Sequence, residues 1–158
     1  RIEGRAMADV CPALRSFCED HLDAEHPTLF VDLCGCDFFD STFLGTLLCL
    51  QKLYGRPGGP SVVLVAPSET CEQTLRRMSA HLLFPFASRA EHEPPPPSAW
   101  KQIAEQAADR ATLTFQQQVV DSHNQLATVP GPVGDLYRPI ARMAERELVS
   151  RQSSSGGR

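Results

Sequence analysis

The sequence has few lysines, no long apolar run and no paired cysteine motif. Lys52 and Lys101 are the only lysines among 158 residues, and 15 basic residues stand against 19 acidic ones, a net charge of −4. Nucleic-acid binding needs a stripe of basic side chains, so we expect no nucleic-acid partner. No apolar run reaches the length of a membrane span and no signal-peptide pattern opens the chain. We therefore expect a cytoplasmic protein without direct membrane insertion.

The six cysteines do not form a metal-binding or disulfide motif. No C-x-x-C pair occurs, and Cys34 and Cys36 alone lack further ligands nearby in the sequence. Free cysteine packs well as a small apolar residue in a reducing compartment. We therefore predict buried thiols, and we expect neither a metal nor a cofactor.

Catalytic motifs are missing as well. The sequence has no G-x-S-x-G turn, no glycine-rich phosphate loop and no H-E-x-x-H. The histidines fall on predicted helices or linkers without paired ligand spacing. His123 lies on an apolar helical face, so we interpret it as a core residue and not as a catalytic base. We expect no enzymatic activity and no catalytic residue.

The chain does contain a strand, a polar turn and a helix in close succession. Thr28–Leu33 is rich in β-branched and aromatic residues and is too short for a helix. Phe43–Tyr54 is apolar at helical spacing, and Ser61–Ala66 is a second buried strand. The turn Asp40–Thr42 thus falls at a helix N-terminus, where free N–H groups and the helix dipole favour a phosphate.

Further elements complete an α/β pattern. Val10–Leu22 places its apolar residues on one helical face. Ser68 is a predicted N-cap of a third helix, and Leu83–Ala87 is a short closing strand. Alternating strands and helices predict a mixed, mostly parallel sheet covered by helices. Right-handed crossovers predict Ser41 and Ser68 at the same end of the domain.

These residues, in this order, resemble a STAS domain, the module of bacterial anti-sigma factor antagonists. The signature of that family is a hydrophobic strand ending in D-S-[S/T]-G-L-G before a helix, then a second apolar strand and an NPS-like turn. The corresponding segments here are FVDLCGCDFFDSTFLG, SVVLVAPSE and CEQTLRRMSAHLLFPF, within residues 2–86. Two features depart from the pattern. Phe43 stands where the family usually has glycine, and the strands that open the domain are almost absent.

The resemblance implies a phosphorylation switch at Ser41. In the family, the serine after the aspartate is phosphorylated by an anti-sigma factor that is itself a serine kinase. The unphosphorylated antagonist binds this partner and so releases the sigma factor for transcription, whereas the phosphorylated form dissociates. A phosphate adds about −1.5 to −2 charge, enough to break such an interface. Thr42 is a second candidate acceptor. The predicted partner-binding residues are Asp37, Asp40, Ser41, Thr42, Phe43, Leu44 and Ser68.

Two questions stay open at the level of sequence. Ser41 and Thr42 also have the chemistry of ordinary helix caps. If they only cap the helix, the protein is a non-phosphorylated STAS adaptor in a signalling assembly or in a lipid or anion transport system. The ring of Phe43 either packs into the core or forms an exposed anchor for a partner.

By composition the chain divides into four segments. Residues 1–88 are the STAS-like domain, with its N-terminal strands expected to be truncated; Ile2–Arg5 spells either a protease recognition string or the end of a native strand. Residues 89–97 are a proline-rich linker. Residues 98–150 form a helical hairpin, packed on the first domain or on a partner, with Pro139 at the start of its second helix or kinking it. Residues 151–158 form a disordered tail.

Overall fold

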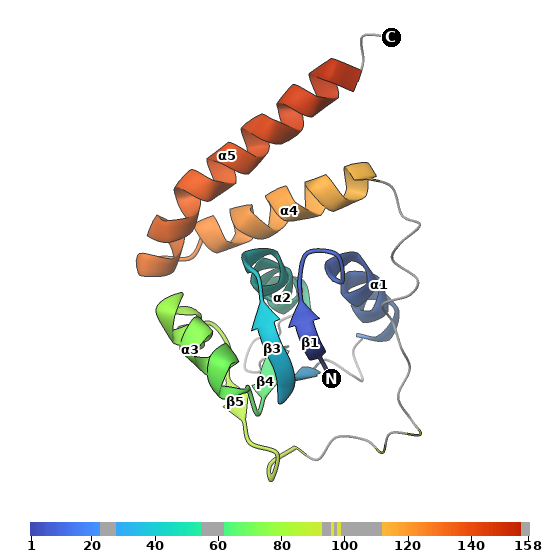
Figure 1. Ribbon diagram of the computed structural model, residues 1–158, viewed down its shortest axis with the longest axis vertical. Coiled ribbons are helices and arrows are strands. Elements are labelled where there is room, and N and C mark those ends of the chain that lie inside the picture. Colours follow the sequence, from blue (N-terminus) through green and yellow to red (C-terminus); the bar gives the residue numbers. More distant parts are fainter. Residues whose placement is uncertain (23–27, 55–61, 93–95, 97, 99–111, 156–158) are drawn as a thin grey trace.

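The computed structural model describes residues 1–22, 28–54, 62–92, 96, 98 and 112–155. Predictions for residues 23–27, 55–61, 93–95, 97, 99–111 and 156–158 lie outside the described residues. Strands and helices alternate through the first half, and two long helices follow (Figure 1). The elements in chain order are β1 (Glu3–Ala6), α1 (Cys11–His21), β2 (Leu29–Asp32), β3 (Gly35–Phe39), α2 (Ser41–Tyr54), β4 (Val62–Val65), α3 (Glu69–Arg77), η1 (Ala80–Leu82), β5 (Phe86–Ala87), α4 (Thr112–Ala127) and α5 (Pro132–Ser155).

All strand pairings within the described ranges are parallel. β1 pairs with β3, and a second sheet has the order β2-β4-β5. Parallel neighbours need a crossover connection, which the intervening helices supply. The predicted α/β class, with parallel strands covered by helices and helices at the C-terminal end, is confirmed.

β2 and β3 follow each other in the chain but belong to different sheets, and a short turn connects them. Asp32 ends β2, and its Oδ1 accepts a hydrogen bond from the N–H of Cys34 at 2.9 Å. The N–H of Ile2 donates to the carbonyl of Asp32 at 2.9 Å, so the two sheets meet at this turn. Residues of the possible recognition string form β1. Gly4 has a φ of 72° where the β1–β3 register shifts, a conformation that glycine reaches without steric cost.

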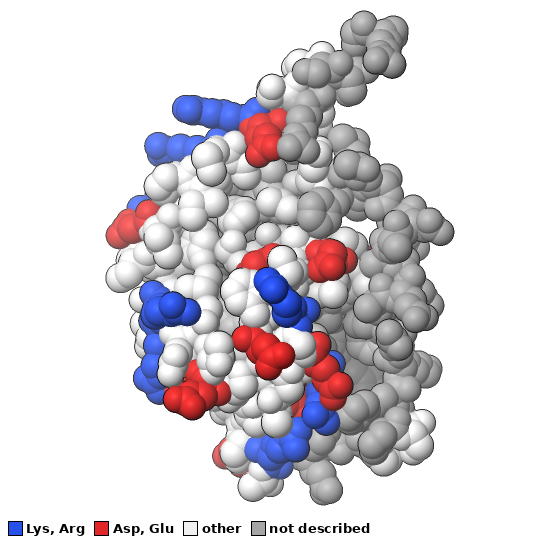
Figure 2. Space-filling view, in the orientation of Figure 1, with Lys and Arg blue, Asp and Glu red and all other residues white. Residues whose placement is uncertain are grey.

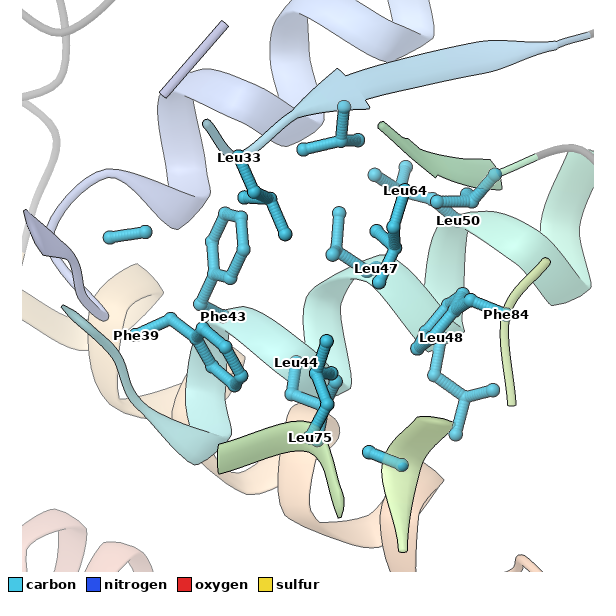
Figure 3. Packing of buried hydrophobic residues seen from close by; sticks show 14 of the residues in the cluster. Leu33, Phe39, Phe43, Leu44, Leu47, Leu48, Leu50, Leu64, Leu75 and Phe84 are labelled. Atoms are coloured by element: carbon cyan, nitrogen blue, oxygen red, sulfur yellow. The ribbon is translucent and has the colours of Figure 1, made fainter. Parts of the chain in front are cut away.

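A single hydrophobic cluster joins the sheets to the C-terminal helices. Figure 3 shows the ring of Phe43 beside Phe39, and the two ring centroids are 6.3 Å apart. Phe43 is 1% exposed, so the ring packs into the core and is not a surface anchor. Leu126, Val133 and Tyr137 from α4 and α5 belong to the same cluster. The hairpin therefore packs on the α/β layer.

Helix α5 begins earlier than the sequence pattern predicts. Its first residue is Pro132, so Pro139 lies within the helix and not at its start. A proline at the first helical position loses nothing, because that N–H has no intrahelical partner. Pro139 removes one hydrogen bond from the helix interior, which the surrounding packing tolerates.

Helix α5 also ends later than predicted. It continues to Ser155, so the prediction of a disordered tail is wrong for residues 151–155. Extending an existing helix adds one hydrogen bond for each residue that is fixed, whereas starting a new one is costly. The hydroxyl of Ser153 adds a further bond to the carbonyl of Val149 at 2.9 Å.

The surface carries charges of both signs. On the face in Figure 2, acidic and basic side chains are interspersed among uncharged residues. Among the helices within the described ranges, none is both long and apolar enough to cross a bilayer.

Candidate functional site

Asp40 closes the N-terminus of α2. Its Oδ1 accepts a hydrogen bond from the N–H of Phe43 at 2.9 Å, three residues along the chain, which is the bond of a helix N-cap. Its Oδ2 accepts from the N–H of Ala8 at 2.9 Å and ties the turn to the loop before α1. The side chain that caps α2 is therefore Asp40, which leaves the hydroxyl of Ser41 for other contacts.

Ser41 is the first residue of α2 and is half-buried. Its Oγ lies 2.9 Å from Nε2 of His123 on α4, a residue 82 positions further along the chain. This hydrogen bond joins the helix that carries the predicted phosphorylation site to the C-terminal hairpin.

His123 is a buried residue of the hairpin. It is 8% exposed, and its ring lies against that of Tyr137 with 6.2 Å between the centroids. Burial lowers the pKa of His123, and the carbonyl of Val119 and the carboxylate of Asp40 oppose this shift only in part. The neutral imidazole is therefore favoured near pH 7. Its Nδ1 has no hydrogen-bond partner among the described residues.

Helices α2 and α4 cross at close range beside this bond. A Cβ placed on Gly45 would lie 2.4 Å from the carbonyl oxygen of Ser122, so the crossing requires glycine. Oγ1 of Thr46 lies 3.2 Å from Oγ of Ser122, and the amide of Gln118 donates to the same Thr46 oxygen at 3.5 Å. Polar groups thus meet at the centre of the interface.

A small cavity of about 10 Å³ lies between α2 and α4. Thr46 and Cys49 line it from α2, and Gln118 and Asp121 from α4. A single water needs about 10–15 Å³ measured in this way, so the cavity holds one water at most. It is too small for a substrate.

Ser68 caps α3, as the sequence predicts. Its Oγ accepts from the N–H of Cys71 at 3.3 Å and donates to the carbonyl of Cys36 at 2.6 Å. Cys36 is the second residue of β3, whereas Ser41 lies two positions after its last residue, Phe39. Since a strand advances about 3.3 Å per residue, most of β3 separates the two serines. They do not share one end of the domain, because β3 and β4 belong to different sheets.

The other predicted partner-binding residues differ in exposure. Asp37 on β3 is exposed. Thr42 is 5% exposed, and Phe43 and Leu44 are 1% exposed each. The structure thus brings Asp40 and Ser41 together at one turn but places Thr42, Phe43 and Leu44 beneath the surface.

The cysteines are all free, and four of the six are buried. Cys34 is exposed and Cys49 is half-buried, so the prediction of buried thiols holds for the other four. Burial raises the pKa of Cys11 to about 12, whereas hydrogen bonding between Cys36 and Cys71 lowers the pKa of the Cys71 thiol. No group of three or more potential metal ligands occurs in the described part of the chain.

Comparisons with protein-family models, with curated proteins and with solved structures found no match. Two residues of this site, Gly45 and His123, were not expected from sequence. His123 was interpreted as a core residue, which its burial supports, but its bond to Ser41 spans 82 positions and leaves no local signal. Gly45 matches the last glycine of the signature, yet its role depends on a helix that the signature does not include.

Proposed function

We propose that this chain is an anti-sigma factor antagonist of the STAS type. It binds an anti-sigma factor kinase in the cytoplasm and dissociates when that kinase phosphorylates Ser41. Sigma-factor-dependent transcription is then regulated by partner switching. The proposal assigns no enzymatic activity to the chain itself.

The observation that carries this proposal is that the hydroxyl of Ser41 does not cap α2. Asp40 provides the cap through its bond to the N–H of Phe43, and Ser41 instead bonds to His123 on another element. A group at this position can be modified without removing the cap. It also lies where a change of charge acts on a helix–helix interface.

A serine beside a histidine is also the arrangement of a nucleophile and its base. The surroundings favour a different role. Asp40, the nearest carboxylate in sequence, is occupied by the N–H groups of Phe43 and Ala8. The small cavity between α2 and α4 is lined by residues such as Thr46 and Gln118 and not by Ser41 or His123.

A non-phosphorylated STAS adaptor is the second candidate. The same Ser41–His123 bond favours it, because a part-buried bond between two helices also serves a purely structural purpose. In that case the chain acts as a scaffold in a signalling assembly or in a lipid or anion transport system. The two candidates differ in whether charge at Ser41 controls binding.

A pull-down with the full chain as bait separates them. The baits are the wild type, Ser41→Ala and Ser41→Asp, with Ser153→Asp as a control that adds the same charge on an exposed residue of α5. We expect a kinase-type anti-sigma factor on every bait except Ser41→Asp. Phosphopeptide mapping of the wild type distinguishes Ser41 from Thr42. The same partner on both Ser41 variants, or transport components in its place, would contradict the switch.

A further inference from the structure

Helix α4 covers the face of α2 that carries Ser41. In Figure 1, α4 lies across α2, and α5 lies on the far side of α4. Interfaces between the parts of one chain are more polar than permanent interfaces and resemble transient ones. The hydrogen bonds along this interface join Ser41 to His123, Thr46 to Ser122, and Lys52 to both Gln125 and Thr128.

We infer that the α4–α5 hairpin is an intramolecular cover over α2, and that docking of the hairpin and phosphorylation of Ser41 exclude each other. The inference rests on the proposed function and assigns a regulation to that site. A kinase reaches the Ser41 hydroxyl only after α4 leaves α2, because Oγ is held 2.9 Å from buried His123.

The chemistry of phosphoryl transfer to Ser41 shows why the phosphate and the docked hairpin exclude each other. The kinase moves the γ-phosphoryl group of a nucleoside triphosphate onto Oγ of Ser41, so an O–P bond forms there and the nucleoside diphosphate leaves. The hydroxyl proton passes to a base of the kinase, and Oγ can no longer donate to His123. The phosphate adds about −1.5 to −2 charge beside the Asp40 carboxylate.

The phosphate also acts on docking directly. It places three oxygens and the added charge where Oγ now lies 2.9 Å from Nε2 of buried His123, so the docked arrangement cannot accept it unchanged. The phosphorylated chain therefore exposes the face of α2 that α4 covers in the unmodified chain.

Cys49 is a built-in reporter of this opening. It lies on α2, half-buried, and lines the small cavity together with Gln118 and Asp121 of α4. With Cys34→Ser removing the exposed thiol, alkylation of Cys49 measures undocking of α4. Cys36 and Cys71 are buried in the α/β layer and report global unfolding in the same sample.

Gly45→Ala tests whether the hairpin can leave on its own. The added methyl meets only Ser122 of α4 among its nearest neighbours, and alanine favours α2 more than glycine does. We expect about tenfold faster alkylation of Cys49 with no change at Cys71. Gly35→Ala is the matched control, because its Cβ meets ordinary contacts at 3.4 Å.

Phosphoserine installed at position 41 during synthesis tests the coupling without any partner. We expect Cys49 to alkylate at least about fivefold faster than in the unmodified chain. An unchanged rate would overturn the inference. A slower rate would also overturn it, because it would mean that a protonated His123 binds the phosphate and tightens docking.

A reversible disulfide between α2 and α4 tests whether docking of the hairpin prevents phosphorylation of Ser41. Thr46→Cys with Ser122→Cys, in a Cys49→Ser chain, places two thiols where the hydroxyl oxygens lie 3.2 Å apart. Mild oxidation with a small disulfide forms the crosslink between the two protein thiols and releases two molecules of the small thiol. We expect phosphorylation of Ser41 in an ATP-supplemented kinase extract to fall at least about fivefold and to return on reduction. Equal phosphorylation of the crosslinked and the reduced chain would overturn the inference that the hairpin covers Ser41.

The phosphoserine measurement needs no anti-sigma factor. Its outcome is therefore separable from that of the pull-down.

Discussion

His123 is the residue through which pH acts on the hairpin. Burial lowers its pKa in the folded protein below the value of about 6.5 in the unfolded chain. The unfolded state therefore binds the proton more readily. Stability is fully present above about pH 6.5 and is lost as the pH falls through the lowered pKa of the folded protein.

We therefore expect the free energy of unfolding of the wild type to fall between about pH 6.5 and 5 by more than that of His123→Gln. Urea titrations at several pH values measure both. Glutamine keeps a polar group near Ser41 but does not titrate. Parallel pH profiles for the two proteins would show that His123 does not carry this dependence.

Phe43 shows why a departure from a family signature is readable only in the structure. The signature resembled here has a small residue at this position, and the sequence allowed either a buried ring or an exposed anchor. The ring is 1% exposed and packs 6.3 Å from that of Phe39. Neighbouring core residues, and not the local turn, decide between the two, because packing depends on side chains distant in sequence.

At the scale of elements, the turn between α4 and α5 depends on one glycine. Gly131 has a φ of 79°, in the left-handed region, and no atom lies within 4 Å of the position of a Cβ. Gly131→Ala therefore strains the backbone without a steric clash. We expect a cost of about 1–2 kcal/mol in the free energy of unfolding, measured with urea.

Gly131→Asn is the informative comparison, since asparagine tolerates the left-handed conformation better than alanine. We expect it to recover part of the lost stability. If alanine and asparagine cost the same, the loss comes from something other than the backbone conformation.

Elements with strong local patterns were predictable, and those made by distant pairing were not. The apolar runs at residues 28–33, 43–54 and 61–66 gave β2, α2 and β4 within two residues of their ends. β3 was not predicted as a separate strand, because its place depends on the parallel partner β1. In the site, Asp40 and Ser41 follow from the turn chemistry, but His123 and Gly45 acquire their roles only when α4 docks.

At the scale of the whole molecule, the hairpin is part of the hydrophobic cluster and yet is attached differently from the strands. Leu126 and Tyr137 belong to the same cluster as the α/β core. The four residues of β4 are all buried, with parallel partners on both sides. The α2–α4 interface instead combines apolar contacts with hydrogen bonds between side chains, such as Thr46 to Ser122.

This difference predicts that the hairpin and the sheet open at different free energies. We expect native-state hydrogen exchange to show α4 and α5 amides opening together at a lower free energy than those of β4, because the interface of the hairpin with α2 is partly polar whereas β4 is buried along its whole length. Gly45→Ala should lower the value for α4 by about 1 kcal/mol or more and leave that of β4 unchanged. Equal opening free energies for α4 and β4 would mean that hairpin and sheet unfold as one unit. Ser41 would then be reached only by global unfolding, and a cover that opens separately would have no physical basis.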